Sequence, residues 1–147
     1  MLSAALTTRV TSVLAEGAPV FPSAGRFASI IERYGVRIFK AGVTFLKSVM
    51  SDPQNAQDVQ RYDLSSLRVA TFCAEPVSHA VQAFGMELMT PWYINSYWAT
   101  EHGGIVWTHF YGNGDFPLRS DAHTYPLPWI MGDVWIPEGE PSGEGRL

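Results

Sequence analysis

Hydrophobic residues first recur at helical spacing in the region that follows Pro22 and Ser23. They occupy positions i, i+3, i+4 and i+7, as Phe27, Ile30, Ile31 and Tyr34. This spacing places them on one face of an α-helix. Serine is a common residue at helix starts, and Gly35 is of the type that ends helices. The pattern therefore predicts a helix that begins at Pro22 and Ser23 and ends at Gly35.

The rest of the first hundred residues alternates between short apolar strands and helices. The pattern predicts a helix near residues 2–8, a strand at 11–14, a buried strand at 36–39, a helix at 44–50, a strand at 68–73, a helix at 78–88 and a strand at 93–97. Residues 51–61 are polar, and we expect a surface excursion there, followed by a turn that Asp63 caps through Leu67. Strands that alternate with helices indicate an α/β fold.

The pattern changes after Gly104. Residues 105–110 are strand-like, and Asn113 with Gly114 is a hairpin-turn signal. Regular structure is then interrupted by Pro117, Pro126 and Pro128. A further strand is predicted to start at residues 134–136.

Composition and charge exclude several classes of protein. Apolar residues make up 46% of the 147 residues, which suffices for one core and no more than one domain. A net charge of −4 with ten Lys and Arg argues against a nucleic-acid surface, and the single Cys73 excludes an internal disulfide framework. No stretch approaches the roughly 18 to 20 apolar residues of a membrane span. We therefore expect a cytoplasmic protein that binds neither nucleic acid nor membrane.

The residues with most chemistry gather between positions 92 and 104. Tyr97 and Trp98 offer flat surfaces for a base or a small acyl group. Thr100 can donate a hydrogen bond to a phosphate oxygen, and Glu101 is a hard oxygen ligand suited to Mg²⁺. This combination indicates a nucleotide site.

The sequence Tyr-Trp-Ala-Thr-Glu-His-Gly-Gly at residues 97–104 resembles the aromatic-aromatic-x-Thr-Glu-x-Gly-Gly signature of the adenylate-forming acyl-CoA synthetases. Further stretches keep the order of features in that family, at residues 17–20, 25–27, 62–68, 74–76 and 143–145. Within the acetate and propionate group, residues 95–109 most resemble the branch that activates 3-hydroxypropionate and propionate, including the synthetase part of propionyl-CoA synthase.

This resemblance implies an α/β fold that is a fragment of the large N-terminal domain of an adenylate-forming enzyme. Residues 1–128 would be part of the α/β AMP-binding subdomain, and residues 129–147 would start a β-rich segment that is cut at Leu147. The chain contains neither the family's phosphate loop ending in Lys-Gly, nor its Thr-Gly-Asp ribose motif, nor the lysine of its C-terminal domain. We therefore expect an internal piece that does not catalyse adenylation alone.

The resemblance also implies a reaction in two steps. A short carboxylic acid, namely acetate, propionate, acrylate or 3-hydroxypropionate, attacks the α-phosphate of ATP to give acyl-AMP and pyrophosphate. The thiol of CoA then displaces AMP. Besides ATP and CoA, the reaction would use Mg²⁺. Neither step needs a protein nucleophile, so catalysis would rest on positioning and charge neutralisation.

Matching motif positions implies a role for each site residue. Thr100 and Glu101 would be catalytic, because Thr100 would contact phosphate and Glu101 would hold Mg²⁺. The nucleotide side would comprise Ala74, Glu75, Pro76, Asn95, Tyr97 and Thr100. Cys73 and Trp98 would border the acyl pocket, where the indole leaves room for only a short chain. Residues 41–44 replace the family's Thr-Ala-Pro-Thr segment by Ala-Gly-Val-Thr, and no role is assigned to them.

Strand order gives an independent reason to group these residues. Ligands of open α/β sheets bind just past the carboxyl ends of the strands. Glu75 follows the predicted strand at 68–73, and Thr100 and Glu101 follow the one at 93–97. We therefore expect the two motifs to face one crevice.

Other interpretations stay open. The chain could be a non-catalytic remnant that keeps the scaffold and binds a nucleotide, an acyl group or a protein partner. Tyr97 and Trp98 could be core aromatics. A zinc cluster is disfavoured because the histidine spacings match no compact ligand pattern, at His79, His102, His109 and His123. An apolar face exposed by truncation would favour self-association.

Overall fold

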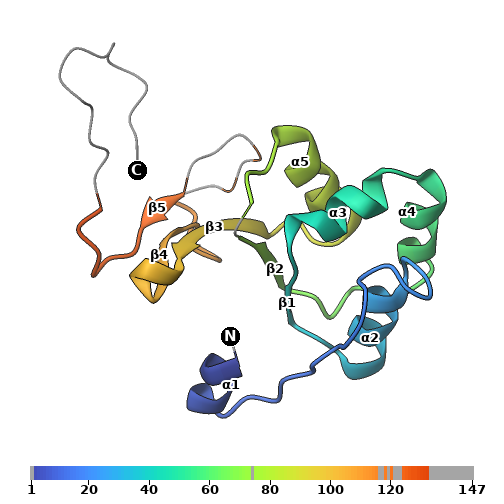
Figure 1. Ribbon diagram of the computed structural model, residues 1–147, viewed down its shortest axis with the longest axis horizontal. Helices are drawn as coiled ribbons and strands as arrows, with labels where there is room; N and C mark the ends of the chain where they lie inside the picture. The colour runs from blue at the N-terminus through green and yellow to red at the C-terminus, as the bar shows by residue number, and fades with distance from the viewer. Residues whose placement is uncertain (1, 74, 116–117, 119, 121–123, 133–147) are drawn as a thin grey trace.

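The computed structural model describes residues 2–73, 75–115, 118, 120 and 124–132. Its helices and strands occur in the order α1 (Leu2–Thr8), α2 (Arg26–Tyr34), β1 (Ile38–Lys40), α3 (Val43–Met50), α4 (Pro53–Gln60), β2 (Val69–Phe72), α5 (His79–Leu88), β3 (Tyr93–Ala99), the 3₁₀ helix η1 (Thr100–His102), β4 (Gly104–Thr108) and β5 (Tyr125–Pro126) (Figure 1). The fold is mixed α/β with an open sheet, as the sequence predicts.

The sheet changes character along β3. Its strand order is β1-β2-β3-β4-β5, with parallel pairing from β1 to β3 and antiparallel pairing from β3 to β5. Residues 93–95 of β3 pair with β2, whereas residues 96–99 pair with β4. β3 therefore joins the α/β part of the chain to its β-hairpin part.

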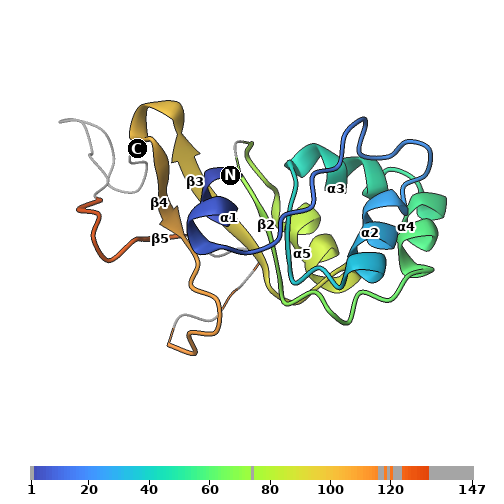
Figure 2. The same cartoon turned by 90° about the horizontal axis from the view of Figure 1, so that it is seen from below.

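The four helices α2 to α5 lie together on one side of β1 and β2, and α1 lies apart from them (Figure 2). β1, β2 and β3 are neighbours in sequence order, and right-handed crossovers between such strands put the connecting helices on the same face of the sheet. Burial alternates accordingly along β2, where Ala70 and Phe72 are fully buried while Val69 and Thr71 are only half-buried.

Aromatic rings make up much of the core between this sheet and the helices. Phe27 of α2, Phe39 of β1 and Phe45 of α3 form a triangle of ring contacts, with centroids 5.2 to 5.7 Å apart. Tilted and edge-to-face contacts at such distances are favourable arrangements of aromatic pairs. The helices add side chains with no exposed surface, namely Val43, Leu46, Val49 and Val59.

α5 sits closely on β3 and α3 because it carries a glycine at the contact. A Cβ on Gly85 would lie 2.8 Å from Leu46 Cδ1 and 3.0 Å from Tyr93 Cδ2, both in fully buried side chains. One turn earlier, the buried Gln82 donates from Nε2 to the carbonyl oxygen of Tyr93 at 3.1 Å. This hydrogen bond satisfies a polar side chain that would otherwise be costly to bury.

Most of the predicted elements are confirmed to within two residues at each end, as expected for element boundaries. They are the helices at 2–8, 44–50 and 78–88 and the strands at 36–39, 68–73, 93–97 and 105–110. Ser78 caps α5 by accepting from the Val81 amide, and Asp63 accepts from the Ser65 amide in the predicted turn.

The helix that ends at Gly35 is confirmed, but two of its details are wrong. α2 begins at Arg26, because Ser23 instead accepts from the Gly25 amide and donates to Asp58 of α4 at 3.1 Å. Tyr34 is 57% exposed, whereas Ala28 and Ile31 are the residues that α2 buries. The face of α2 that packs into the core therefore contains Ala28 and Ile31, and Tyr34 lies outside it.

The polar excursion predicted at residues 51–61 is wrong, because α4 occupies it. Asp52 caps this helix by accepting from the Gln54 amide at 2.9 Å, and Pro53 opens its first turn. Both are known start signals. The spacing of apolar residues does not predict this helix, because Val59 is its only fully buried residue.

The strand predicted at residues 11–14 is also wrong, since these residues have no regular structure in the described part of the chain. Leu14 is 71% exposed, so the apolar run does not enter the core. A strand needs a partner that supplies hydrogen bonds, and the sheet order contains no strand from this region.

Asn113 and Gly114 do not close a two-residue hairpin as predicted. β4 pairs with β5 through Thr108 and Tyr125, so the connection between them is a long loop. Asn113 instead accepts from the Asp115 amide at 2.9 Å, which is a local turn within that loop. The strand predicted at residues 134–136 and most of the segment 129–147 lie outside the described residues.

The described residues include no helix that is both long and apolar enough to cross a bilayer.

We predict that Gly85→Val lowers the free energy of unfolding by about 1 to 3 kcal/mol, because the added carbons overpack a full core between α3 and β3. Urea unfolding of the wild type and the variant measures the change. Gly114→Val is the matched control, since a Cβ there meets nothing within 4 Å, and it should change stability by less than about 0.5 kcal/mol. Equal effects of the two substitutions would contradict the packing argument.

Candidate functional site

The first part of the candidate site follows β2, where Glu75 is held by α3. Thr44 Oγ1 donates to Glu75 Oε1 at 2.7 Å, and Lys47 Nζ lies 3.4 Å from Glu75 Oε2. Pro76 follows and is exposed. Ala74, which the sequence groups with them, lies outside the described residues. Two side chains of α3 therefore contact the carboxylate of Glu75.

These contacts change the acidity of Glu75. The hydrogen bond from Thr44 lowers the pKa of the Glu75 carboxyl below its ordinary value of 4.5, desolvation opposes this shift, and Lys47 adds to it. A donor that binds the charged form always favours ionisation. Glu75 is thus an anion at neutral pH.

The second part of the site is at the end of β3. Tyr97 and Trp98 are 37% and 38% exposed although they are consecutive in a strand, where side chains normally alternate between faces. The pairing of β3 with β4 shifts register between these two residues, and such a bulge redirects side chains. Within the described residues neither ring is packed into the core. The Tyr97 ring also contacts the ring of His102, at 5.6 Å between centroids.

Thr100 and Glu101 occupy η1, the tight turn that joins β3 to β4. The turn is closed by the Gly103 amide, which donates to the Thr100 carbonyl at 3.1 Å, and Gly103 has a φ of 70°. This left-handed conformation favours glycine. Both side chains are exposed, and neither forms a hydrogen bond with another described residue. A free hydroxyl and a free carboxylate suit a phosphate contact and a hard metal ligand, respectively.

Parallel pairing puts the two parts on the same edge of the sheet. Phe72 of β2 is in register with Asn95 of β3, so Glu75 and η1 both follow carboxyl ends of neighbouring strands. β3 continues past Asn95 for four residues, to Ala99, which is a rise of about 13 Å. Both parts thus follow strands that run in the same direction, and a single crevice lined by both parts stays a prediction.

The two remaining site residues are half-buried beside this edge. Cys73 directly follows β2 and carries a free thiol, and Asn95 lies within β3. Next to Asn95, Ser96 and Thr108 share a hydrogen bond of 2.9 Å across β3 and β4. This bond lies beside the junction between the parallel and antiparallel parts of the sheet.

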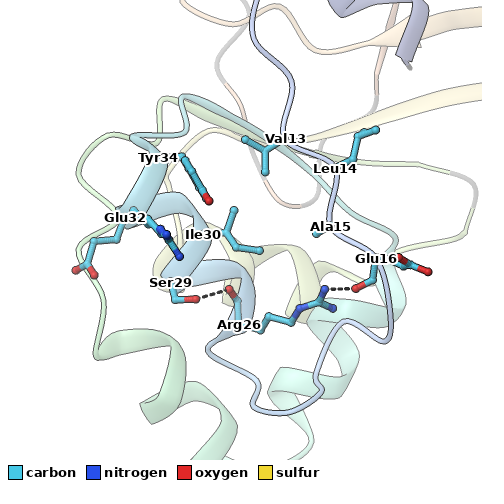
Figure 3. A pocket seen from close by; sticks show the side chains of 10 residues that line it. Val13, Leu14, Ala15, Glu16, Arg26, Ser29, Ile30, Glu32 and Tyr34 are labelled. Atoms are coloured by element: carbon cyan, nitrogen blue, oxygen red, sulfur yellow. Dashed lines mark hydrogen bonds between the residues drawn. The ribbon is translucent and has the colours of Figure 1, made fainter.

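A groove of about 560 Å³ lies elsewhere, between residues 13–16 and α2 (Figure 3). The Arg26 guanidinium crosses it and donates to the carbonyl oxygens of Ala18, at 2.9 Å, and Glu16. The groove is lined by none of the residues that the sequence assigns to a site. It therefore gives no support to the nucleotide site.

Sequence reasoning missed Thr44 and Lys47. They follow β1, whose carboxyl end lies on the same edge as those of β2 and β3. The signal was available, since a hydroxyl and a cation spaced i, i+3 face the same way on a helix. What the sequence could not supply was their neighbour, Glu75, which is 31 residues from Thr44.

The histidines form no metal centre in the part of the chain that is described. No group of three or more His, Cys, Asp or Glu there could hold an ion, and His123 is outside it. His109 is buried between Trp92 and Tyr125, and neither of its ring nitrogens has a hydrogen-bond partner among the described residues.

Comparison with known proteins finds relatives over most of the chain. A family model described as AMP-binding enzyme matches residues 1–144. The chain is 34% identical over 140 residues to an acetyl-coenzyme A synthetase of Pyrobaculum aerophilum. This match covers 92% of the chain and 20% of that protein. The chain is 32% identical over 151 residues to the acetyl-coenzyme A synthetase of Cupriavidus metallidurans, covering 97% of the chain and 22% of that protein. The chain thus spans about a fifth of the length of these curated relatives.

A solved structure is also similar. The anthranilate CoA ligase AuaEII, crystallised in complex with anthranoyl-AMP, superposes with a TM-score of 0.59 at 25% sequence identity. The match covers 71% of this chain and 19% of that one.

We predict that Thr44→Val raises the pKa of Glu75 toward 4.5, because the variant lacks the donor that stabilises the carboxylate. A folded-state pKa below the unfolded value contributes stability above the unfolded pKa, and this contribution is lost as pH falls through the lowered folded pKa. The contribution of the contact with Thr44 to folding stability should therefore decrease only as the pH falls below 4.5. Carboxyl ¹³C chemical shifts, followed by NMR during an acid titration, report the pKa directly. An unchanged pKa in the variant would exclude Thr44 as the cause.

Proposed function

The chain belongs to the AMP-binding enzyme family, and from this membership we propose that it carries part of the nucleotide and acid site of an ATP-dependent acyl-CoA ligase. The relatives named above are acetyl-coenzyme A synthetases, which supports activation of a carboxylic acid. Because the chain spans only about a fifth of their length, the activity proposed is that of the full-length protein.

One observation carries the proposal, namely the exposed group of side chains at the end of β3. Tyr97, Trp98, Thr100 and Glu101 include two aromatic surfaces, a hydroxyl and a carboxylate within five consecutive residues, and all four are exposed. The two rings lie outside the core cluster of the described residues, which leaves their faces available to a ligand. These four side chains lie at the carboxyl end of a sheet strand, which is the position where α/β proteins bind ligands.

Each residue has a proposed part in binding ATP and Mg²⁺. Glu101 would hold Mg²⁺, whose positive charge offsets the negative charge of the phosphates when the ion is bound. Thr100 would donate a hydrogen bond to a phosphate oxygen, and Tyr97 would stack near the adenine. The nucleotide would be bordered further by Ala74, Glu75, Pro76 and Asn95.

The acid would lie against Trp98, with Cys73 near the acyl pocket. An indole at the end of a pocket leaves space for only a short chain, so we propose acetate, propionate, acrylate or 3-hydroxypropionate as substrates. Residues 95–109 favour the 3-hydroxypropionate and propionate branch among these. The acyl group would then pass from acyl-AMP to the thiol of CoA.

We predict that Glu101→Gln in the full-length protein lowers acid-dependent exchange of pyrophosphate into ATP by about 100-fold or more, because the amide is a much weaker ligand for Mg²⁺. The melting temperature should stay unchanged, since Glu101 makes no hydrogen bond within the described residues. Isotope exchange with labelled pyrophosphate is the measurement.

Glu87→Gln is the matched control for this experiment, because Glu87 is exposed on α5 and lies outside the proposed site. It should keep wild-type exchange. If the wild-type protein binds ATP but shows no exchange with any of the four acids, the chain belongs to a non-catalytic nucleotide-binding relative. Full exchange by Glu101→Gln would remove the metal assignment.

We predict that Trp98→Ala shifts acid preference toward longer chains. Removing the indole opens space for additional methylenes, each of which is worth roughly 10- to 200-fold in selectivity at a well-fitted pocket. The ratio of kcat/KM for hexanoate to that for propionate should therefore rise by at least about tenfold. Trp129→Ala serves as control, because Trp129 is 76% exposed and outside the site. An unchanged ratio for Trp98→Ala would place the acyl pocket elsewhere.

A further inference from the structure

One cluster of side chains ties the segment after β2 to α3, and we call it the α3 anchor. It consists of Thr44, Lys47 and Glu75, joined by the hydrogen bond of 2.7 Å and the ion pair of 3.4 Å described above. The sequence positions of Thr44 and Lys47 precede Glu75 by 31 and 28 residues. The anchor is therefore a tertiary contact and not a local turn.

α3 is held in place by its packing against the core. Its opposite face is fully buried through Val43, Leu46 and Val49, so the helix cannot shift without opening the core. Thr44 and Lys47 are spaced i, i+3 and both reach one carboxylate from the exposed face. A carboxylate held by two donors on a fixed helix retains little freedom.

We infer that Thr44 and Lys47 are positioning residues that hold Glu75 and Pro76 against α3, so that this wall of the nucleotide site is formed before ATP binds. The inference rests on the proposed function for its ligand. Neither residue needs to touch ATP, because both act through Glu75. It also gives a role to Thr44, the last residue of the segment 41–44 and the one that matches the resembled family's Thr-Ala-Pro-Thr.

Loss of the α3 anchor should affect ATP affinity more than global stability. The three side chains are exposed, and exposed ion pairs contribute little to global stability. Ordering a short segment in advance, in contrast, lowers the entropy cost of ligand binding. Loss of the anchor should therefore weaken ATP binding while leaving the melting temperature and the chemical step nearly unchanged.

A competing account predicts the opposite sign. If the Glu75 carboxylate had to leave α3 in order to bind ATP, the anchor would compete with the nucleotide. Breaking the anchor would then tighten ATP binding, because the cost of releasing Glu75 would be gone. The direction of the change in affinity separates the two accounts.

Amide hydrogen exchange of the full-length protein without nucleotide tests the structural half of the inference. Thr44→Val should raise the exchange rates of the Glu75, Val77 and Ser78 amides by about three- to tenfold. Thr44→Ser keeps the hydroxyl and should restore wild-type rates. Ser51→Ala is the control, because it deletes a hydroxyl that donates to the Ser48 carbonyl at the other end of α3. Unchanged rates at these amides in Thr44→Val would overturn the inference.

Steady-state kinetics test the functional half. Thr44→Val should raise the KM for ATP by about three- to tenfold, with kcat and the KM for the acid within about twofold of wild type. Lys47→Met should give a smaller rise, and Thr44→Ser should recover the wild-type KM. A lower or unchanged KM for ATP, or a loss confined to kcat, would overturn the inference. If the wild-type protein shows no acid-dependent exchange, the proposed function fails, and the hydrogen-exchange result still decides whether the anchor orders Glu75.

Discussion

The parallel pairing of β2 with β3 is the constraint on which the rest of the structure depends. Its register places Ala70 beside Tyr93 on the face that α2 to α5 cover, and both are fully buried. A slip of one residue would turn every side chain of β3 to the other face, so the core fixes the register. With the register fixed, Phe72 lies beside Asn95, so Cys73 and Glu75 follow β2 at the level where β3 continues toward Tyr97, Trp98 and η1.

β3 serves two different environments, and this explains the form of the site. Its first half is buried in a parallel sheet, and its second half enters an antiparallel hairpin that leaves the body of helices (Figure 1). The register shift at Tyr97 and Trp98 lies within that second half. A bulge there permits two consecutive aromatic rings to be exposed while the pairing continues to η1. The site is thus built where regular pairing is interrupted.

Sequence reasoning succeeded where local rules and tertiary packing agree. The helix that ends at Gly35 and the strand at β2 both carry strong patterns, and both exist. It failed where the local signal was weak or had no partner. α4 buries only Val59 completely, so its apolar period is too faint to detect, whereas residues 11–14 include Val13 and Leu14 but pair with no strand in the described sheet. Strand formation depends on a partner that the sequence does not name.

The sequence by itself determined the chemistry available to this protein, because the residue types at 97–104 set which groups can stack, donate and bind a cation. It also determined the α/β order of elements, through patterns that span a few turns or strand residues. Only the tertiary structure decided that Thr44 and Lys47 meet Glu75 and that Tyr97 and Trp98 are both exposed. These outcomes depend on the register of β2 and β3 and on the packing of α3. Both are set by contacts between residues far apart in the chain, which no local pattern encodes.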